Sequence, residues 1–228
     1  MDLDTLRFDA DGLIPGLVQS RTGELRMVAW LNREALRRTL DTGFVTFWSR
    51  SRQSLWVKGE TSGNRLRLLQ IRPDCDRDAL LILVDPEGPS CHRGTESCFD
   101  AGPGDAPGAP WPATLPWLGR LEALLQARKA AADPAGSYTQ KLFAQGVDRI
   151  AKKVVEEAGE VILAAKNEDR EAFLGEAADL LFHLDLLLIE RGASLLDVVG
   201  VLHDRHAERH DRQAERQDRH AERPGGPA

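Results

Sequence analysis

Three aspartates at alternate positions form the first group whose residue type and spacing could do chemistry: Asp74, Asp76 and Asp78. In an extended chain, side chains two positions apart share a face, so these carboxylates are expected to converge while Cys75 points away. Like charges this close repel one another unless a cation neutralises them, and Mg²⁺ prefers carboxylate and water oxygens. The spacing indicates a magnesium site, and an acidic turn between two strands is the alternative.

The chain contains three cysteines, Cys75, Cys91 and Cys98, too few for a disulfide framework. Three thiolates are enough for a zinc site that keeps its fourth position for water, whose pKa the metal lowers. The spacing is not that of a zinc finger or ribbon, and the zinc deaminase motif is missing. Three unrelated buried thiols are the alternative.

Two polar segments between the predicted strands lie close together in the sequence and combine hydroxyls, glycines and cations. Such groups suit phosphate binding through backbone N–H groups and charge-assisted hydrogen bonds. Similar loops also occur in proteins that bind nothing. The candidate phosphate contacts are Ser49, Arg50, Ser51, Lys58, Gly59, Thr61, Ser62, Gly63 and Asn64.

Acidic residues with helical spacing form a second constellation: Glu156, Glu157, Glu160, Glu176 and Asp179. Residues three or four positions apart lie on one side of a helix, so each set shares a sector. A solvated acidic face is the alternative for the first set. The second set lies on an otherwise apolar helix, where a carboxylate needs a partner, and His183 on the same stripe is interpreted as a satisfied core histidine. Two such helices packed antiparallel could bring all five acids around Mg²⁺, which would also hold a polyphosphate.

The elements that must position these groups divide the chain into two halves. Residues 1–100 alternate strand-length apolar runs with turn signals, which predicts a strand-rich α+β domain. Asn32 is a suitable N-cap for a helix over Arg33–Asp41, and Gly43 is placed to end it. The predicted strands are Leu25–Leu31, Gly43–Ser49, Ser54–Val57, Leu66–Ile71 and Ala79–Val84.

A linker and an all-α helical bundle follow. Residues 101–116 hold five prolines and three glycines, a density that no regular element tolerates. Residues 117–206 form the helical domain, with an apolar stripe at positions 150, 154, 158, 161, 162 and 165. The predicted helices are Trp117–Ala131, one capped by Ser137, Asp148–Lys166, one from about Asp169 to Glu190, and a last helix from Ser194.

The low-complexity tail, residues 207–228, belongs to a repeat of period seven that offers a coiled coil almost nothing to bury. We interpret it as a solvated helical extension that frays into disorder. The net charge of −6 argues against binding to nucleic acid or to an anionic membrane surface. Neither a secretory signal nor a membrane span is evident, so a reducing cytoplasm is expected.

Four motifs in the first half resemble phosphoribosyl-AMP cyclohydrolase of histidine biosynthesis, in order and over nearly all of residues 10–100. They are Phe47–Arg52, Leu55–Asn64, Asp74–Asp78 and Gly88–Phe99. The resemblance implies zinc held by Cys75, Cys91 and Cys98, and magnesium near the three aspartates. It also implies a homodimer in which one chain supplies Cys75 and the other supplies Cys91 and Cys98. Water activated by zinc would attack C6 and open the N1–C6 bond of the purine ring, with His92 as the candidate for proton transfer or else a structural histidine.

The pattern E-E-x-x-E followed by E-x-x-D resembles the all-α nucleoside-triphosphate pyrophosphohydrolases. The flanking segments Gly136–Leu142, Gly146–Ile150 and Ala164–Asn167 narrow the resemblance to phosphoribosyl-ATP pyrophosphohydrolase, over about residues 118–206. Gly159 departs from the pattern, since a larger helix former is expected there. The resemblance implies magnesium-assisted attack of water between the α- and β-phosphates, with Glu157 or Glu160 orienting the water. The candidate phosphate contacts are Lys141, Lys152, Lys153 and Lys166.

These observations favour a bifunctional hydrolase whose substrates are phosphoribosyl nucleotides. The second half would convert phosphoribosyl-ATP to phosphoribosyl-AMP and pyrophosphate, and the first half would open the ring of that product. One alternative is a general nucleotide pyrophosphohydrolase with a non-catalytic metal-binding first domain. The other is a zinc-binding scaffold without enzymatic activity.

Overall fold

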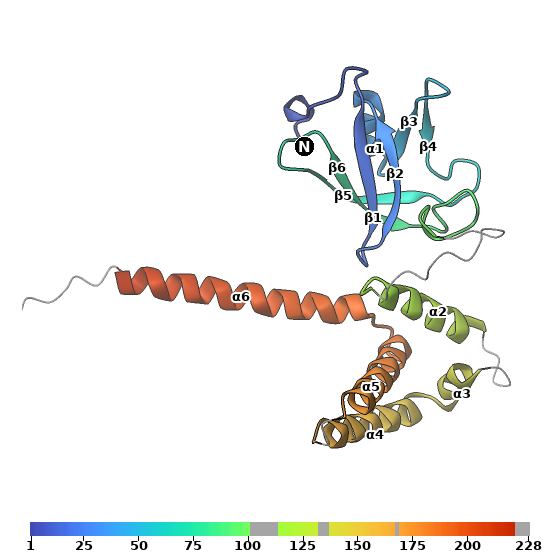
Figure 1. Ribbon diagram of the computed structural model, residues 1–228, viewed down its shortest axis with the longest axis vertical. Coiled ribbons are helices and arrows are strands. Elements are labelled where there is room, and N and C mark those ends of the chain that lie inside the picture. The colour runs from blue at the N-terminus through green and yellow to red at the C-terminus, as the bar shows by residue number, and fades with distance from the viewer. Residues whose placement is uncertain (101–113, 132–136, 167–168, 222–228) are drawn as a thin grey trace, which may run out of the picture. The chain divides into compact units, whose positions relative to one another are not determined.

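The computed structural model describes residues 1–100, 114–131, 137–166 and 169–221, with side chains as far as residue 209. The chain divides into two units, Met1–Trp117 and Leu118–Ala228, which are described separately (Figure 1). Most of the predicted linker and the end of the predicted tail lie outside the described residues.

The first unit is a curled sheet of six strands in the order β4-β3-β2-β1-β6-β5 (Figure 1). β1 and β6 are parallel, and all other neighbouring strands are antiparallel. Backbone hydrogen bonds from Val45 to Leu66 and from Leu68 to Gly43 join the start of β5 to the segment before β3. The strands are β1 (Ile14–Ser20), β2 (Leu25–Leu31), β3 (Thr46–Ser49), β4 (Ser54–Val57), β5 (Leu66–Pro73) and β6 (Leu80–Pro86).

Helix α1 (Arg33–Thr42) begins at the predicted residue and ends one residue after the predicted Asp41, with Asn32 and Gly43 as its caps. The Asn32 side chain accepts a hydrogen bond from the Ala35 N–H at 2.8 Å, and Gly43 closes the helix with a φ of 72°. Because Gly43 belongs to this cap, the strand predicted over Gly43–Ser49 begins only at Thr46. The buried side of the helix lies in one apolar core with strand residues such as Leu31, Phe47 and Ile82.

Strand β1 was not predicted. It contains Pro15 and Gly16, two residues that usually argue against a strand interior. Gly16 is required by a close approach, since a Cβ there would lie 2.6 Å from the Leu31 side chain. Ile14 and Val18 on either side are fully buried, so the strand is central to the core.

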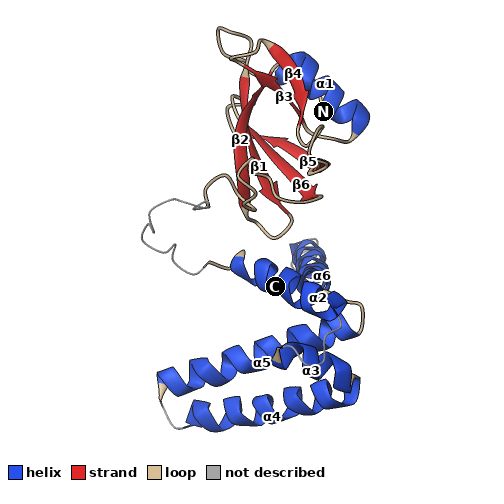
Figure 2. Cartoon of the chain, turned by 90° about the vertical axis from the view of Figure 1, so that its right-hand side faces the viewer, coloured by secondary structure: helices blue, strands red, loops and turns tan. Residues whose placement is uncertain are grey.

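The second unit is helical, as predicted (Figure 2). Ser137 and Gln140 form a reciprocal capping box at the start of α3. α4 and α5 run side by side and antiparallel, and Leu125, Leu142, Ile150 and Leu186 form the core of the unit. The helices are α2 (Trp117–Ala131), α3 (Tyr138–Gln145), α4 (Val147–Lys166), α5 (Arg170–Glu190) and α6 (Leu195–Ala221).

The apolar stripe predicted on α4 is wrong at its far end. Ile162 and Ala165 are exposed, whereas the buried side of the helix carries Ala164 and the charged residue Glu157. The helical extension predicted beyond residue 206 is present, because α6 continues to Ala221. Within the described residues, no helix has the length and apolar character that crossing a bilayer requires.

Candidate functional sites

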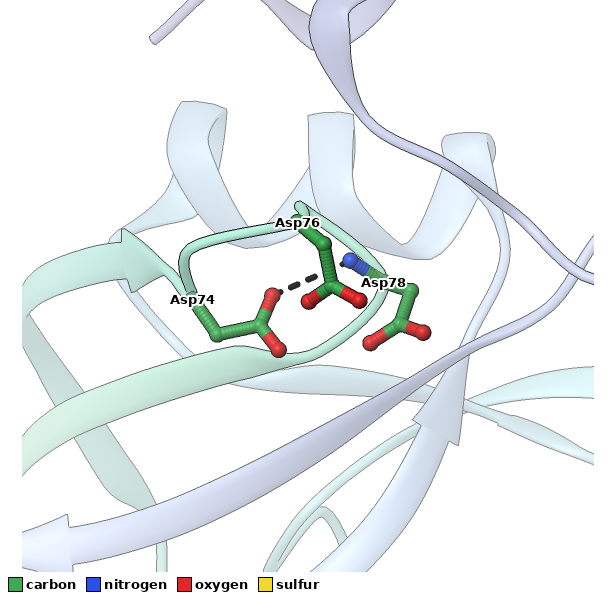
Figure 3. Close-up of side chains that lie close together, drawn as sticks. All are labelled: Asp74, Asp76 and Asp78. Atoms are coloured by element: carbon green, nitrogen blue, oxygen red, sulfur yellow. Dashed lines mark hydrogen bonds between the residues drawn. The ribbon is translucent and has the colours of Figure 1, made fainter.

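The three aspartates lie in the loop that joins β5 to β6, and they converge as predicted (Figure 3). One carboxylate oxygen from each of Asp74, Asp76 and Asp78 lies within 4.8 Å of the other two. The reason given in the prediction is wrong, because the loop is a bend with Arg77 at a φ of 66° and not an extended chain. Asp74 Oδ1 shapes this bend by accepting the N–H groups of Asp78 at 3.0 Å and Ala79 at 3.1 Å.

Repulsion between these carboxylates shifts a pKa in this loop. Asp76, and to a smaller extent Asp74, raise the pKa of the exposed Asp78 carboxyl. The backbone N–H of Ala79 instead lowers the pKa of Asp74. A cluster of exposed carboxylates that repel one another is a donor set suited to a hard divalent cation such as Mg²⁺.

Cys91 and Cys98 lie in the loop after β6, and their thiols are neighbours. Burial, and then Cys91, raise the pKa of the Cys98 thiol, whereas the Arg93 backbone lowers the pKa of Cys91. Cys91 Sγ lies 3.9 Å from Nδ1 of the exposed His92. The ammonium group of Lys58 also acts on this pair, since the two thiols counter the lowering of its pKa by burial. Two soft ligands are therefore brought together in one chain.

Cys75 lies at the opposite end of the β5–β6 hairpin. Pro73 pairs with Leu80 at the end that carries Cys75, and Leu66 pairs with Pro86 at the end that leads to Cys91 and Cys98. A strand of seven residues spans roughly 20 Å between these ends. No metal-ligand cluster of three residues in the described part of the chain includes a cysteine. One chain therefore does not gather all three thiols.

The segment from Lys58 to Asn64 packs on the cysteine loop. A Cβ on Gly59 would overlap the carbonyl oxygen of Asn64, and a Cβ on Gly88 would overlap the Asn64 side chain. Lys58 is buried, and its Nζ donates to the Asn64 carbonyl at 3.4 Å. The intervening residues Thr61, Ser62 and Gly63 are exposed.

The other polar segment lies at the opposite end of the β3–β4 hairpin, so a single chain does not place the two segments side by side. Ser49 pairs with Ser54 at one end of the β3–β4 hairpin, and Lys58 follows Val57 at the other. In that turn, Ser49 Oγ lies 3.4 Å from Ser51 Oγ, and the Arg50 guanidinium covers the Trp30 ring at 4.8 Å.

The helical unit brings together three of its five predicted acids. One carboxylate oxygen from each of Glu157, Glu176 and Asp179 lies within 4.8 Å of the other two. Glu160 is adjacent, because the carboxyls of Glu157 and Glu176 raise its pKa. Glu156 instead pairs with Lys153 at 2.9 Å. Carboxylates from two helices therefore form a second donor set for a divalent cation.

Glu157 is the buried member of this site, with 4% of its surface exposed. Lys153 Nζ lies 2.6 Å from its carboxylate and lowers its pKa. His183 has partners at both ring nitrogens, the Asp179 carbonyl at 2.8 Å and the Tyr138 hydroxyl at 3.2 Å, which agrees with a satisfied core histidine. Lys153 is thus committed to the acids, whereas the other three predicted phosphate contacts are exposed: Lys141, Lys152 and Lys166.

Asp185 and Arg26 are among the buried charged residues that the sequence analysis missed. Asp185 on α5 is 1% exposed, and neither carboxylate oxygen has a hydrogen-bond partner within the described residues. Burial, with a contribution from Glu122, raises its pKa to about 7. Arg26 on β2 is 5% exposed. In the sequence, each of the two is a single charged residue between apolar neighbours, a pattern that could have indicated burial.

Comparison with known proteins covers both units. A family model described as phosphoribosyl-AMP cyclohydrolase matches residues 27–100, and one described as phosphoribosyl-ATP pyrophosphohydrolase matches residues 118–206. The histidine biosynthesis bifunctional protein HisIE of Bacillus subtilis is 50% identical over 90% of this chain and 97% of its own length. The proteins of that name from Escherichia coli (50% identity, 86% and 92%) and Photobacterium profundum (49%, 86% and 93%) are similar to the same extent. The chain belongs to the family of bifunctional histidine-biosynthesis enzymes that join a phosphoribosyl-AMP cyclohydrolase to a phosphoribosyl-ATP pyrophosphohydrolase.

Proposed function

We propose that each unit uses its own metal-ligand cluster for one of two successive hydrolyses. The helical unit would release pyrophosphate from phosphoribosyl-ATP, and the sheet unit would open the purine ring of the phosphoribosyl-AMP produced. The observation that carries the proposal is that each unit gathers three carboxylates within 4.8 Å of one another. Each unit also matches the family model of a hydrolase, one over residues 27–100 and the other over residues 118–206.

In the helical unit, Glu157, Glu176 and Asp179 would hold Mg²⁺. When bound, the ion would neutralise the acids and polarise a phosphate oxygen. Glu160, whose pKa its acidic neighbours raise, is placed to accept a proton from water that attacks between the α- and β-phosphates. Glu157 would orient that water while Lys153 keeps its carboxylate ionised.

In the sheet unit, Cys91 and Cys98 would hold zinc together with Cys75 of a second copy. When bound, zinc would lower the pKa of a water molecule. His92 lies beside Cys91 and is exposed, so it can exchange a proton with the purine ring when the N1–C6 bond opens. The aspartate loop would hold Mg²⁺ near the substrate phosphates.

We infer a homodimer from the separation of the thiols along the β5–β6 hairpin. Because Cys75 and the Cys91–Cys98 pair lie at opposite ends, a second copy running the other way can complete each zinc site. Symmetry then generates two equivalent sites in a closed dimer. We also propose that the enzyme works in the cytoplasm, where its three free cysteines remain reduced.

Two substitutions assayed in parallel test both assignments. Cys91→Ala should abolish ring opening and leave pyrophosphate release intact, whereas Glu176→Gln should abolish pyrophosphate release and leave ring opening of supplied phosphoribosyl-AMP intact. Glu171→Gln, an exposed acid on the same helix, is the control that should change neither. Ring opening that survives Cys91→Ala would remove the zinc assignment, and pyrophosphate release that survives Glu176→Gln would remove the magnesium assignment.

A further inference from the structure

Arg26 is a buried cation in β2, and its guanidinium contacts two acids. Nη1 lies 2.9 Å from Glu24, which directly precedes β2, and Nη2 lies 2.5 Å from Glu96 in the cysteine loop. The same side chain donates from Nε to Ser90 Oγ at 3.0 Å and from Nη2 to the Gly88 carbonyl at 3.3 Å. One side chain therefore joins three separate points of the loop to the sheet.

The backbone of the same strand holds the far end of the loop. The Cys98 N–H donates to the Arg26 carbonyl at 2.8 Å, and Ser97 Oγ donates to the Leu25 carbonyl at 2.7 Å. Cys98 is thus fixed to the residue whose side chain holds the beginning of the loop. Cys91 lies between these two attachments.

Apolar packing contributes little to holding this loop. Between Gly88 and Cys98, Cys91 is the only buried hydrophobic residue among those the structure describes. Bonds within the loop, from the Ser90 N–H to the Glu96 carbonyl and from the Cys91 N–H to the Thr95 carbonyl, close a small turn but do not attach it to the sheet. Charge-assisted hydrogen bonds, which are stronger than neutral ones, therefore hold the loop in place.

We propose that Arg26 is a positioning residue for the metal ligands Cys91 and Cys98, because it fixes their loop on β2 before any metal binds. A pair of ligands that is already ordered binds an ion more tightly, since binding then costs less conformational entropy. The consequence for zinc rests on the proposed function of the sheet unit. The prediction that Arg26 orders the loop in the metal-free chain is independent of that proposed function.

The first test measures loop order without metal. In the metal-free full chain, iodoacetamide should modify the buried Cys91 roughly tenfold or more faster after Arg26→Leu, because charge-assisted bonds that oppose opening are lost. The rate at Cys91 in the urea-unfolded chain, where the loop no longer protects the thiol, is the reference. Arg67→Leu removes an exposed arginine that pairs with Glu87 and is the matched control. An unchanged rate at Cys91 would overturn the proposal.

The second test measures metal binding on the same variants. Zinc affinity at the cysteine site should fall roughly 10- to 100-fold in Arg26→Leu, the usual cost of losing a residue that orients metal ligands. Arg26→Lys should recover part of the loss, because an ammonium can reach one of the acids. Pyrophosphate release by the helical unit should stay at the wild-type level in every variant, because the substitutions lie in the sheet unit.

The outcomes separate the two proposals. Absence of zinc binding in the wild-type chain would overturn the proposed function, whereas wild-type zinc affinity in Arg26→Leu would overturn the positioning role. If Arg26→Leu does not fold, Glu96→Gln provides the test, since its side chain is half exposed and the Arg26–Glu24 pair is kept. It should increase Cys91 modification in the same direction by a smaller factor, and no increase would contradict the proposal.

Discussion

Lys153 Nζ lies 2.6 Å from Oε1 of Glu157, one helical turn further along α4. The glutamate is almost fully buried, so its charge would be costly without a partner. Lys153 lowers the pKa of Glu157 and keeps its carboxylate ionised, while the other acids of the site repel one another. The helical unit therefore holds part of its neutralising charge within its own chain, and Glu157, Glu176 and Asp179 are the donor set that we propose for Mg²⁺.

Replacing Lys153 with Met should destabilise the metal-free helical unit by about 1–3 kcal/mol, because Glu157 loses its partner for a buried charge. Mg²⁺ should recover most of this loss, since it binds the folded acid site and not the unfolded chain. Thermal unfolding with and without Mg²⁺ measures both effects. The exposed Lys152, replaced by Met in the same way, should show neither, and equal losses in the two variants would contradict this account.

Asp185 should make the stability of the helical unit depend on pH. Its pKa is raised to about 7 in the folded chain by burial, whereas an unfolded aspartate has a pKa of 3.8. Between these values the folded state holds one more proton, so its contribution to stability is present at acid pH and is lost as the pH rises towards 7. Above pH 7 both states are ionised and the dependence ends.

Asp185→Leu should remove this dependence. Its stability advantage over the wild-type chain should grow by on the order of 3–4 kcal/mol between about pH 4 and pH 7 and then stay constant. Urea unfolding at pH 4, 5, 6, 7 and 8 measures this difference, and Glu171→Leu, at an exposed position on the same helix, is the control. A constant difference at every pH would show that Asp185 stays ionised in the folded chain.

Gly59 should tolerate no side chain, although Gly63 four residues later should. Both have a positive φ, near 80°, which costs alanine about 1 kcal/mol. Only at Gly59 would the added Cβ overlap the Asn64 backbone, and nothing lies within 4 Å of a Cβ at Gly63. Gly59→Ala should therefore displace Lys58 and reduce ring opening far more than Gly63→Ala does. Assays of both activities test this, because pyrophosphate release should remain unchanged in each variant.

The sequence predicts local features of this chain better than its distant contacts. Asn32 and Gly43 cap α1 as expected, because caps depend on residues within one turn. β1 was missed because Pro15 and Gly16 weaken the strand pattern, and Gly16 is explained only by Leu31 on the next strand. For β1, the local sequence therefore argued against a strand, whereas packing against the neighbouring strand requires one.

The sites follow the same division. The aspartates converge because they are close in sequence, even though the backbone that brings them together is a bend. Burial of Asp185 depends on the helices that pack around it, and the apolar residues beside it in the sequence are a local sign of that burial. The ion pair between Arg26 and Glu96 joins residues 70 positions apart, so composition and periodicity could not reveal it.

The separation of Cys75 from Cys91 along the β5–β6 hairpin allows a test of the shared zinc site by complementation. Cys75→Ala and Cys91→Ala should each abolish ring opening alone. A mixed dimer of the two would combine the intact Cys75 of one copy with the intact Cys91 and Cys98 of the other, so one of its two sites is complete.

Random mixing of the two variants after dissociation should therefore restore about a quarter of the wild-type ring-opening rate, because half of the dimers are mixed and each has one working site. Mixing Cys91→Ala with Cys98→Ala should restore nothing, since every site in the mixed dimer then lacks either Cys91 or Cys98. No recovery in the first mixture would place all three ligands within one chain and would require the β5–β6 hairpin to rearrange on metal binding. Recovery in the second mixture would mean that Cys91 and Cys98 of one site come from different copies, which would also contradict this account.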